Sequence, residues 1–200
     1  MRILDKKIVG SRALLVFDEG KEVEIDREVY LEKGLYAKDE IDQKELEEVL
    51  FESGLKSAKK MLVSYIQRYP LKSEYGYYKY LLSRGYDSAT ALKAVAYFVN
   101  SGYIDEMEAA KKLVNKYQKK KSSFEILQLL RKNGFKSSTI SKLNLKPEND
   151  KEILVKLLQK KLRRVNKKDS KEILKIIKWF VSRGYDYNTV VEKIREFLDY

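Results

Sequence analysis

Lysine and arginine side chains gather in two runs of this sequence, and neutralising phosphates is the chemistry they could perform. Residues 111–136 hold nine basic residues and one acidic residue, Glu125, and residues 160–171 hold seven more basic residues. Cations at helical spacing can contact several phosphates, and they can also dock on an acidic protein surface. A solvated, lysine-rich exterior would carry the same runs. The candidate binding residues are Lys72, Arg84, Lys112, Lys116, Lys119, Lys120, Lys121, Arg131, Lys132, Lys160, Arg163, Arg164, Lys167, Lys168 and Arg183.

Groups that could catalyse a reaction are few. The chain has no cysteine and no histidine, which excludes disulfides, thiolate or imidazole metal sites and every Ser–His or Cys–His pair. Asp105, Glu106 and Glu108 could form a carboxylate site, but their position at a predicted helix start is typical of helix caps. There is no phosphate-binding loop of the Gly-x-x-x-x-Gly-Lys type. We therefore predict no catalytic residue, no metal and no cofactor.

The charge is distributed unevenly along the chain. The 200 residues carry a formal net charge of +12, yet residues 1–50 hold nine basic and fourteen acidic residues. Such asymmetry predicts an acidic head and a basic body that attracts polyanions or an acidic partner. No apolar run approaches the ~18–20 residues that cross a bilayer, and the first residues lack the apolar core of a signal peptide. We expect a cytoplasmic protein without membrane contact.

The first part of the chain has the pattern of strands. Residues that favour strands occupy 4–9, 13–17 and 23–25. Asp18–Lys21 contains a glycine suited to a tight turn, so the last two strands form a predicted β-hairpin.

Short helices are expected to follow this hairpin. Asp26 opens one that Gly34 ends, and Asp42, with a glutamate three residues later, has the capping-box spacing for another. That second helix is expected to run to about Ser53 and to stop at Gly54.

From residue 57 onward the periodicity is helical, and the chain repeats itself. Ser83–Asp87 recurs without change as Ser182–Asp186, with a weaker copy at Lys132–Lys136. The three glycines lie 49 and then 50 residues apart. A glycine can end a helix in the left-handed conformation, after which a polar residue caps the next helix. This period predicts tandem units of about three helices.

We therefore predict a mainly α fold. Three tandem three-helix repeats form an elongated curved array behind a small N-terminal head that contains the β-hairpin. The expected helices lie near 57–68, 73–84, 87–100, 105–119, 123–133, 138–143, 150–165, 170–183 and 187–198. The predicted domains are the head at 1–54 and the repeats at 55–103, 104–147 and 148–200.

Aromatic residues offer a second kind of contact. Tyr75, Tyr77, Tyr78 and Tyr80 crowd one helix, where one or two could stack on bases or on a partner. We interpret them mainly as packing residues whose hydroxyls reach water, and we interpret Trp179 as structural. Arg84 and Arg183 sit near helix C-termini, where a positive charge is favourable.

Several segments together resemble the RecX family, bacterial regulators of the RecA recombinase. Each motif is short, but their order and spacing are specific, and they cover roughly residues 57–200. The motifs are Arg68–Glu74, like R-x-P-x-S-x-x-E/L; Leu81–Tyr86, like L-x-x-x-G-Y; Gly102–Ala110, like G-Y-[LI]-[DN]-D-x-x-[FY]-A; Arg131–Phe135, like L-x-x-K-G-I; and Trp179–Tyr185, like F-L-x-R-R-G-F. The head resembles a β-hairpin extension of longer members. Ala109 stands where the family has an aromatic residue, and Lys120–Ser123 replaces a usual Gly-Pro.

The resemblance implies tandem three-helix repeats that lie along the groove of the RecA–DNA filament. It also implies suppression of strand exchange, ATPase activity and coprotease activity. We therefore predict a non-enzymatic, monomeric regulator whose partners are the RecA filament and, weakly and electrostatically, single- or double-stranded DNA. One alternative is a stand-alone DNA-binding protein whose glycine turns form helix-turn-helix-like units. A carboxylate-based hydrolase is the other alternative.

Overall fold

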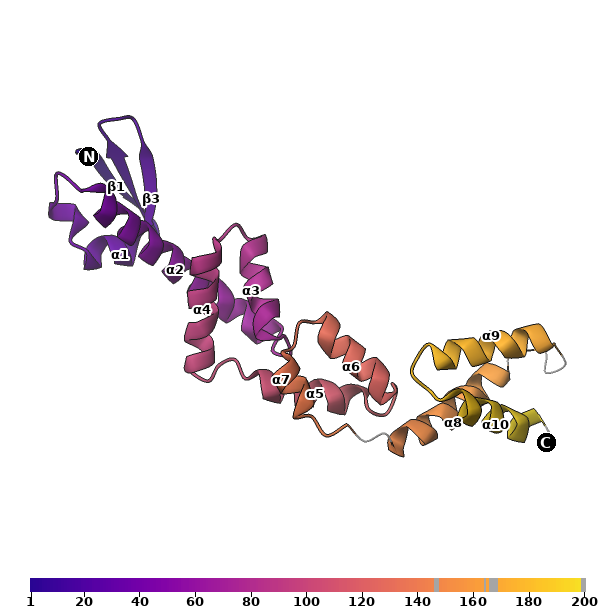
Figure 1. Ribbon diagram of the computed structural model, residues 1–200. Coiled ribbons are helices and arrows are strands. Elements are labelled where there is room, and N and C mark those ends of the chain that lie inside the picture. Colours follow the sequence, from indigo (N-terminus) through magenta and orange to yellow (C-terminus); the bar gives the residue numbers. More distant parts are fainter. Residues whose placement is uncertain (146–147, 164, 166–168, 199–200) are drawn as a thin grey trace. The chain divides into compact units, whose positions relative to one another are not determined.

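The computed structural model describes residues 1–145, 148–163, 165 and 169–198 (Figure 1). The chain divides into two compact units. Unit 1 comprises residues 1–70 and 76–104, and unit 2 comprises residues 71–75 and the chain from 105 onward. We describe each unit by itself.

Unit 1 begins with a three-stranded antiparallel sheet. The strands β1 (Ile3–Val9), β2 (Arg12–Phe17) and β3 (Glu22–Asp26) pair in chain order. Alternate residues of β2, starting with Ala13, are fully buried on one face, which is the period of two that a half-buried strand requires. The strand and hairpin predictions are confirmed, with β1 as a third member of the sheet.

Two short helical turns follow the sheet. Helix α1 (Arg27–Glu32) starts at Asp26, whose carboxylate accepts the N–H of Glu28 at 3.0 Å. Gly34, with φ of 63°, then leads into the 3-10 turn η1 (Leu35–Ala37).

Helix α2 (Gln43–Arg68) corrects the prediction that Gly54 ends a helix. The helix starts at Asp42 as expected, with the N–H of Glu45 donating to the Asp42 carboxylate at 2.8 Å. It then continues through Gly54 for fourteen more residues. A glycine inside a helix costs only about 1 kcal/mol, and buried residues on both sides of it offset that cost. The predicted boundary between residues 54 and 55 therefore falls inside a continuous helix.

Unit 1 is completed by most of α3 (Glu74–Ser83) and by α4 (Ser88–Asn100). Helix α4 packs along α2, and Gly54 lies beside the side chain of Thr90 at this contact. Two hydrophobic clusters fill the unit. One joins the sheet to the first turns of α2, and the other joins the rest of α2 to α3 and α4.

Unit 2 contains six helices in its described residues (Figure 1). They are α5 (Glu106–Tyr117), α6 (Ser123–Lys132), α7 (Ser137–Ser141), α8 (Glu148–Leu162), α9 (Ser170–Val181) and α10 (Tyr187–Leu198). One hydrophobic cluster joins α5 to α7, and another joins α8 to α10.

The mainly helical fold with a small N-terminal sheet is confirmed. Among the described residues, four hydrophobic clusters draw on residues 1–50, 55–104, 109–145 and 154–198. Each of the last three clusters is a three-helix core, which agrees with the repeats. The residue boundaries of the three repeats stay a prediction.

Candidate partner-binding surface

The repeated glycine turns fix the ends of α3, α6 and α9. Gly85, Gly134 and Gly184 have φ values of 88°, 75° and 83°. After the first of them the N–H of Tyr86 donates to the carbonyl of Leu81 at 3.3 Å, and the matching bonds in the other two turns are 3.1 and 3.3 Å long. This is the Schellman pattern, in which the left-handed residue lets the chain cap its own helix. The prediction that these glycines end helices is confirmed.

Two of these turns start the next helix with an aspartate. The Asp87 carboxylate accepts the N–H and the hydroxyl of Thr90 at 2.9 and 2.6 Å. Asp186 accepts the same two groups of Thr189, both at 2.8 Å. The threonine hydrogen bonds hold the pKa of both carboxyl groups below its ordinary value because they favour the charged form. Lys136, in the middle copy, makes no side-chain cap.

A serine hydroxyl reaches the backbone of two of the turns. Ser73 Oγ donates to the carbonyl of Asn133 at 2.6 Å, and Ser122 Oγ donates to the carbonyl of Arg183, also at 2.6 Å. Both serines are fully buried. Each hydroxyl therefore satisfies a carbonyl that the end of the helix leaves without an intrahelical partner.

An aromatic ring covers the glycine of each of these two turns. A Cβ built on Gly134 would stand 2.4 Å from the Tyr75 ring, and one on Gly184 would stand 2.3 Å from Phe124. Only glycine permits this approach. At Gly85, by contrast, nothing described lies within 4 Å of the added Cβ.

Glu106 corrects the interpretation of the acidic residues near 105 as helix caps. Asp105 is the expected cap of α5, but the Glu106 side chain is buried and only 6% exposed. One of its oxygens accepts the N–H of Glu74 at 3.1 Å. The other accepts the N–H of Lys136 at 2.8 Å and the hydroxyl of Thr139 at 2.9 Å. The carboxylate thus fastens backbone groups from two distant segments of unit 2.

Arg183 is held rather than free. Its guanidinium pairs with Glu125 at 3.2 Å and lies 3.6 Å from the centre of the Trp179 ring. Lys161 lies over the same ring at 3.9 Å. The contacts favour the structural interpretation of Trp179, which stays a prediction together with the binding role of Arg183.

The basic run around α5 and α6 is largely exposed. Lys112 pairs with Glu108 at 2.5 Å, and Lys121 lies 3.9 Å from Glu125. Within the described part of the chain, five exposed cations of this run make neither an ion pair nor a cation–π contact. They are Lys111, Lys119, Lys120, Arg131 and Lys132. Lys116, also exposed, lies against the Tyr117 ring at 5.5 Å.

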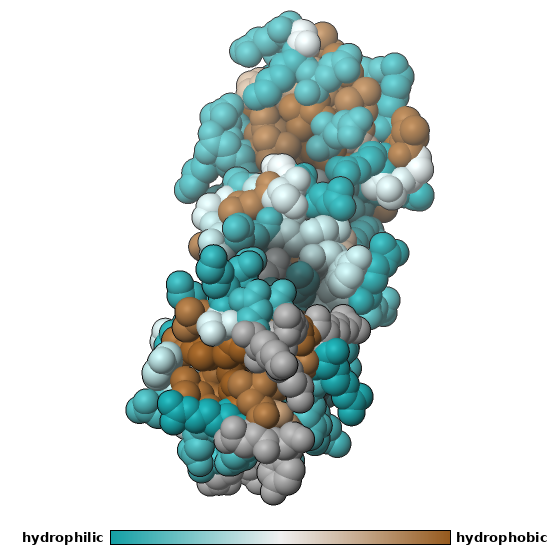
Figure 2. Space-filling view, turned by 90° about the vertical axis from the view of Figure 1, so that its right-hand side faces the viewer, coloured by the Kyte–Doolittle hydropathy of each residue, from teal (hydrophilic) through white to brown (hydrophobic). Residues whose placement is uncertain are grey.

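The second basic run lies at the end of α8. Lys160 and Arg163 are exposed, whereas Arg164, Lys167 and Lys168 lie outside the described residues. A depression of about 420 Å³ opens beside this run. Figure 2 shows hydrophobic side chains exposed on the bundle of α8, α9 and α10. The lining residues of the depression are Leu157, Lys160, Lys161, Val165, Ile176, Trp179 and Arg183.

The remaining candidates lie around α3. Lys72 is half-buried and Arg84 is exposed. The crowded tyrosines take part mainly in packing. Tyr77 is buried with its hydroxyl on the Tyr69 carbonyl at 2.8 Å, and Tyr80 stacks on Tyr65 with ring centres 3.5 Å apart.

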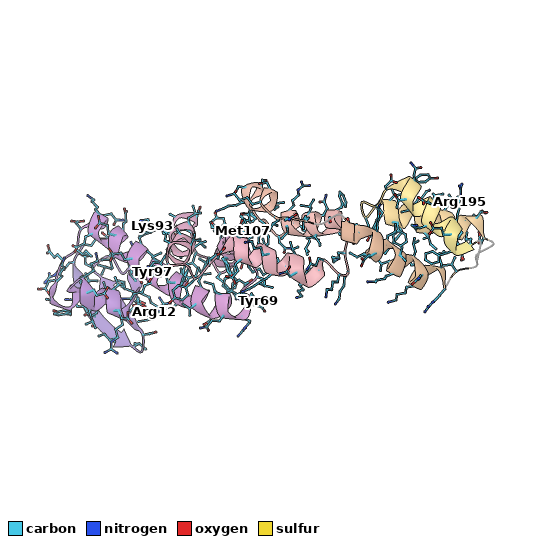
Figure 3. The ribbon with its side chains drawn as sticks, turned by 90° about the horizontal axis from the view of Figure 1, so that it is seen from below. Arg12, Tyr69, Lys93, Tyr97, Met107 and Arg195 are labelled. Carbon is cyan, nitrogen blue, oxygen red and sulfur yellow. The ribbon has the colours of Figure 1, made fainter. Side chains whose placement is uncertain are left out.

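A basic groove in unit 1 was missed by sequence reasoning. It encloses about 500 Å³ between α2 and α4. Tyr97 and Lys93, one turn apart on α4 (Figure 3), form cation–π pairs with α2. Lys59 lies 3.6 Å from the Tyr97 ring, and Lys93 lies 4.5 Å from the Phe51 ring. Three lysines within five residues of the sequence, Lys56, Lys59 and Lys60, could have indicated this groove. The lining residues are Lys56, Lys59, Lys60, Val63, Ile66, Gln67, Tyr97, Phe98 and Tyr103.

Chemically, these surfaces present exposed cations and aromatic rings. No group of three or more acidic side chains that could hold a metal ion occurs among the described residues. In the same residues, no helix is both long and apolar enough to cross a membrane. What the geometry provides is exposed cations on a helical scaffold whose turns are locked by glycine, serine and aromatic residues.

The chain was compared with known proteins, and several are similar to it. No protein-family model matches the chain. The regulatory protein RecX of Clostridium botulinum strain Alaska E43 is 25% identical over 195 residues, which is 95% of this chain and 92% of that protein. The regulatory protein RecX of Clostridium tetani is 27% identical over 163 residues, 78% of this chain and 75% of that protein. The chain is therefore similar, over nearly its whole length, to proteins named regulatory protein RecX.

Solved structures agree with the fold of this chain. A crystal structure titled regulatory protein RecX matches 98% of the chain and 100% of its own length, with a TM-score of 0.70 and 20% identity. A crystal structure of RecX from Lactobacillus salivarius matches 73% of the chain and 97% of its own length, with a TM-score of 0.58 and 17% identity. The relatives named here are regulatory proteins.

Proposed function

We propose that this chain is a non-enzymatic regulator of a RecA-type recombinase. It binds the RecA–DNA filament in its groove and inhibits strand exchange, ATP hydrolysis and coprotease activity. The observation that carries the proposal is the match to proteins named regulatory protein RecX across 95% of the chain. We propose further that it acts as a monomer in the cytoplasm.

The proposed contact surface is the basic run of unit 2. Lys111, Lys119 and Lys120 are exposed, and no described acidic residue pairs with them. Such cations keep their full charge for a partner, so they attract an acidic protein surface or DNA phosphates and accelerate association. Arg131 and Lys132, at the end of α6, extend the same charge.

The proposed mechanism is steric and electrostatic. A helical scaffold seated in the filament groove occupies the space that duplex DNA or a substrate repressor needs. By bridging several recombinase subunits, it also alters how the filament grows or disassembles. The chain itself makes and breaks no bond.

A stand-alone DNA-binding protein is the second candidate function. The groove of unit 1 favours it, because Lys59 and Tyr97 place a cation beside an exposed ring, as in sites that bind single strands. This candidate predicts tight binding to DNA in the absence of recombinase. A helix-turn-helix form of it also predicts a preferred sequence.

The test is the DNA-dependent ATPase rate of the cognate recombinase with this protein titrated in. The wild-type chain is compared with a variant in which Lys111, Lys119 and Lys120 are changed to glutamate. The variant spares Lys121, because that side chain contributes to the pairing around Glu125. We expect inhibition by the wild type and an inhibitory concentration at least about tenfold higher for the variant.

A second charge-reversal variant provides the matched control. Arg12, Lys21 and Lys44 are exposed basic residues of the head, and their change to glutamate alters the net charge equally. If both variants lose inhibition equally, inhibition depends on the overall charge of the protein and not on the basic run. No effect of the wild-type protein at any ratio, together with tight binding to bare DNA, would refute the regulator and support the second candidate.

A further inference from the structure

The turn around Gly85 repeats, residue for residue, a turn that is occupied elsewhere in the chain. Both copies read Ser-Arg-Gly-Tyr-Asp, at 83–87 and at 182–186. Both glycines have positive φ, and both helices end with the same backbone hydrogen bond. In each copy the arginine lies over the aromatic ring four residues earlier, at 5.1 Å in the first and 3.6 Å in the second. The two turns therefore offer one kind of receptor surface.

The second copy holds the start of α6. Ser122 Oγ donates to the carbonyl of Arg183 at 2.6 Å. The side chain of Phe124 covers Gly184 so closely that no Cβ would fit there. Glu125 completes the contact by pairing with the Arg183 guanidinium at 3.2 Å.

The middle turn holds a helix start of the same kind. Ser73 Oγ donates to the Asn133 carbonyl at 2.6 Å, and the Tyr75 ring covers Gly134. A glutamate next to Ser73 pairs with the lysine of this turn at 2.6 Å. Two independent examples thus define one ligand: a serine before a helix, an aromatic residue two positions later, and a nearby glutamate.

The first copy has the receptor but no ligand. Nothing described lies within 4 Å of a Cβ added to Gly85. Arg84 is exposed, and among the described residues neither its guanidinium nor its carbonyl has an acidic or hydrogen-bonding partner. We infer that the Gly85 turn binds the helix N-terminus of a partner protein with a serine or threonine cap, an aromatic residue two positions later and a glutamate for Arg84.

A second copy of this chain is a poor occupant. In the first two helical bundles, the serine of the ligand is the residue just before the second helix of the bundle. In the bundle of α8, α9 and α10, the residue at this position is Asp169. Its carboxylate has no proton to donate to a carbonyl, and Lys171 stands where the aromatic residue is needed. Because Arg84 attracts an acid, the charges favour a different protein whose helix start carries one.

The test uses the ligand segment of the chain itself as a probe. A fluorescein-labelled peptide of residues 119–136 is titrated with the full-length protein, and fluorescence anisotropy follows binding. We expect saturable binding that Arg84→Glu weakens at least about tenfold. A peptide carrying Glu125→Lys should restore binding to that variant, and a peptide carrying Phe124→Ala should bind neither protein.

Two further proteins separate the possible outcomes. Arg12→Glu changes an exposed arginine of β2 and should leave peptide binding unchanged. Arg183→Glu tests whether the peptide merely displaces the α6 of the protein itself. The inference is overturned if binding does not saturate, if Arg12→Glu weakens it as much, or if Arg183→Glu alone abolishes it. The assay contains no recombinase, so its outcome is independent of the proposed regulatory function.

Discussion

Gly184 and Gly85 offer a matched pair for measuring what the aromatic cover contributes. Both glycines have φ above 80°, so alanine at either position suffers the same left-handed strain of about 1–2 kcal/mol. At Gly184 the new Cβ would also stand 2.3 Å from Phe124 Cβ and 2.5 Å from Phe124 Cγ. Carbon atoms prefer a separation of about 3.5–4.0 Å, and overpacking of this kind costs about 1–3 kcal/mol.

We therefore expect Gly184→Ala to lower the free energy of unfolding by about 3 kcal/mol and Gly85→Ala by about 1 kcal/mol. Urea unfolding measures both. Circular dichroism follows the whole chain, and the fluorescence of Trp179, the single tryptophan, follows the bundle that contains Gly184. Equal destabilisation by the two substitutions would refute the contact between Phe124 and Gly184.

Three further predictions concern buried or capping groups. Glu106→Gln replaces one of the two acceptor oxygens with an NH₂ group, which would then face an N–H or O–H donor. We expect the free energy of unfolding, measured in urea, to fall by about 2–3 kcal/mol. Glu108→Gln, at an exposed ion pair, should cost under about 0.5 kcal/mol, and similar losses would contradict the buried role. The hydroxyl of Tyr185 is buried without a hydrogen-bond partner among the described residues, whereas the Tyr86 hydroxyl bonds to a serine at 2.8 Å. Phenylalanine should thus be neutral or stabilising at 185 and cost about 1 kcal/mol at 86, and the reverse order of urea midpoints would show that Tyr185 does have a partner. Finally, hydrogen bonds hold the pKa of Asp87 below its ordinary value of 3.8, so its stabilisation is complete above that pH and is lost as the pH falls through the lower, folded-state pKa. The stability difference between the wild type and Asp87→Asn, from urea unfolding at several pH values, should be constant above about pH 5 and shrink below pH 4, and a difference that grows in acid would contradict this sign.

The sequence predicted those features that local chemistry determines. Three glycines at the ends of apolar stripes predicted three helix ends because a positive φ is inexpensive only for glycine. Asp42, Asp105 and Ser122 predicted helix starts because their oxygens accept free backbone N–H groups. Strand-favouring residues and a turn glycine within the first 26 residues predicted the β-hairpin.

Features that depend on distant contacts were not predicted. Gly54 looks like the other helix-ending glycines, but its helix continues because packing on both sides outweighs the local preference. Glu106 looks like a capping residue, yet groups 30 to 33 residues away surround it. The groove near Lys59 needs α2 beside α4. The candidate cations could be found by charge, but their ion-pair partners came only from the structure.

The continuous course of α2 links the stability of two parts of unit 1. Leu46 and Val49 lie in the hydrophobic cluster of the sheet, whereas Ala58 and Leu62 lie in the cluster of α3 and α4. The single helix α2 therefore contributes to both hydrophobic clusters. If either cluster is destabilised, the half of α2 that packs in it frays, and the helix is then held only by the other cluster. The N-terminal residues that pack on the first half of α2 therefore also support the bundle of α2, α3 and α4. Deleting residues 1–54 would remove the first half of α2 and so destabilise this bundle.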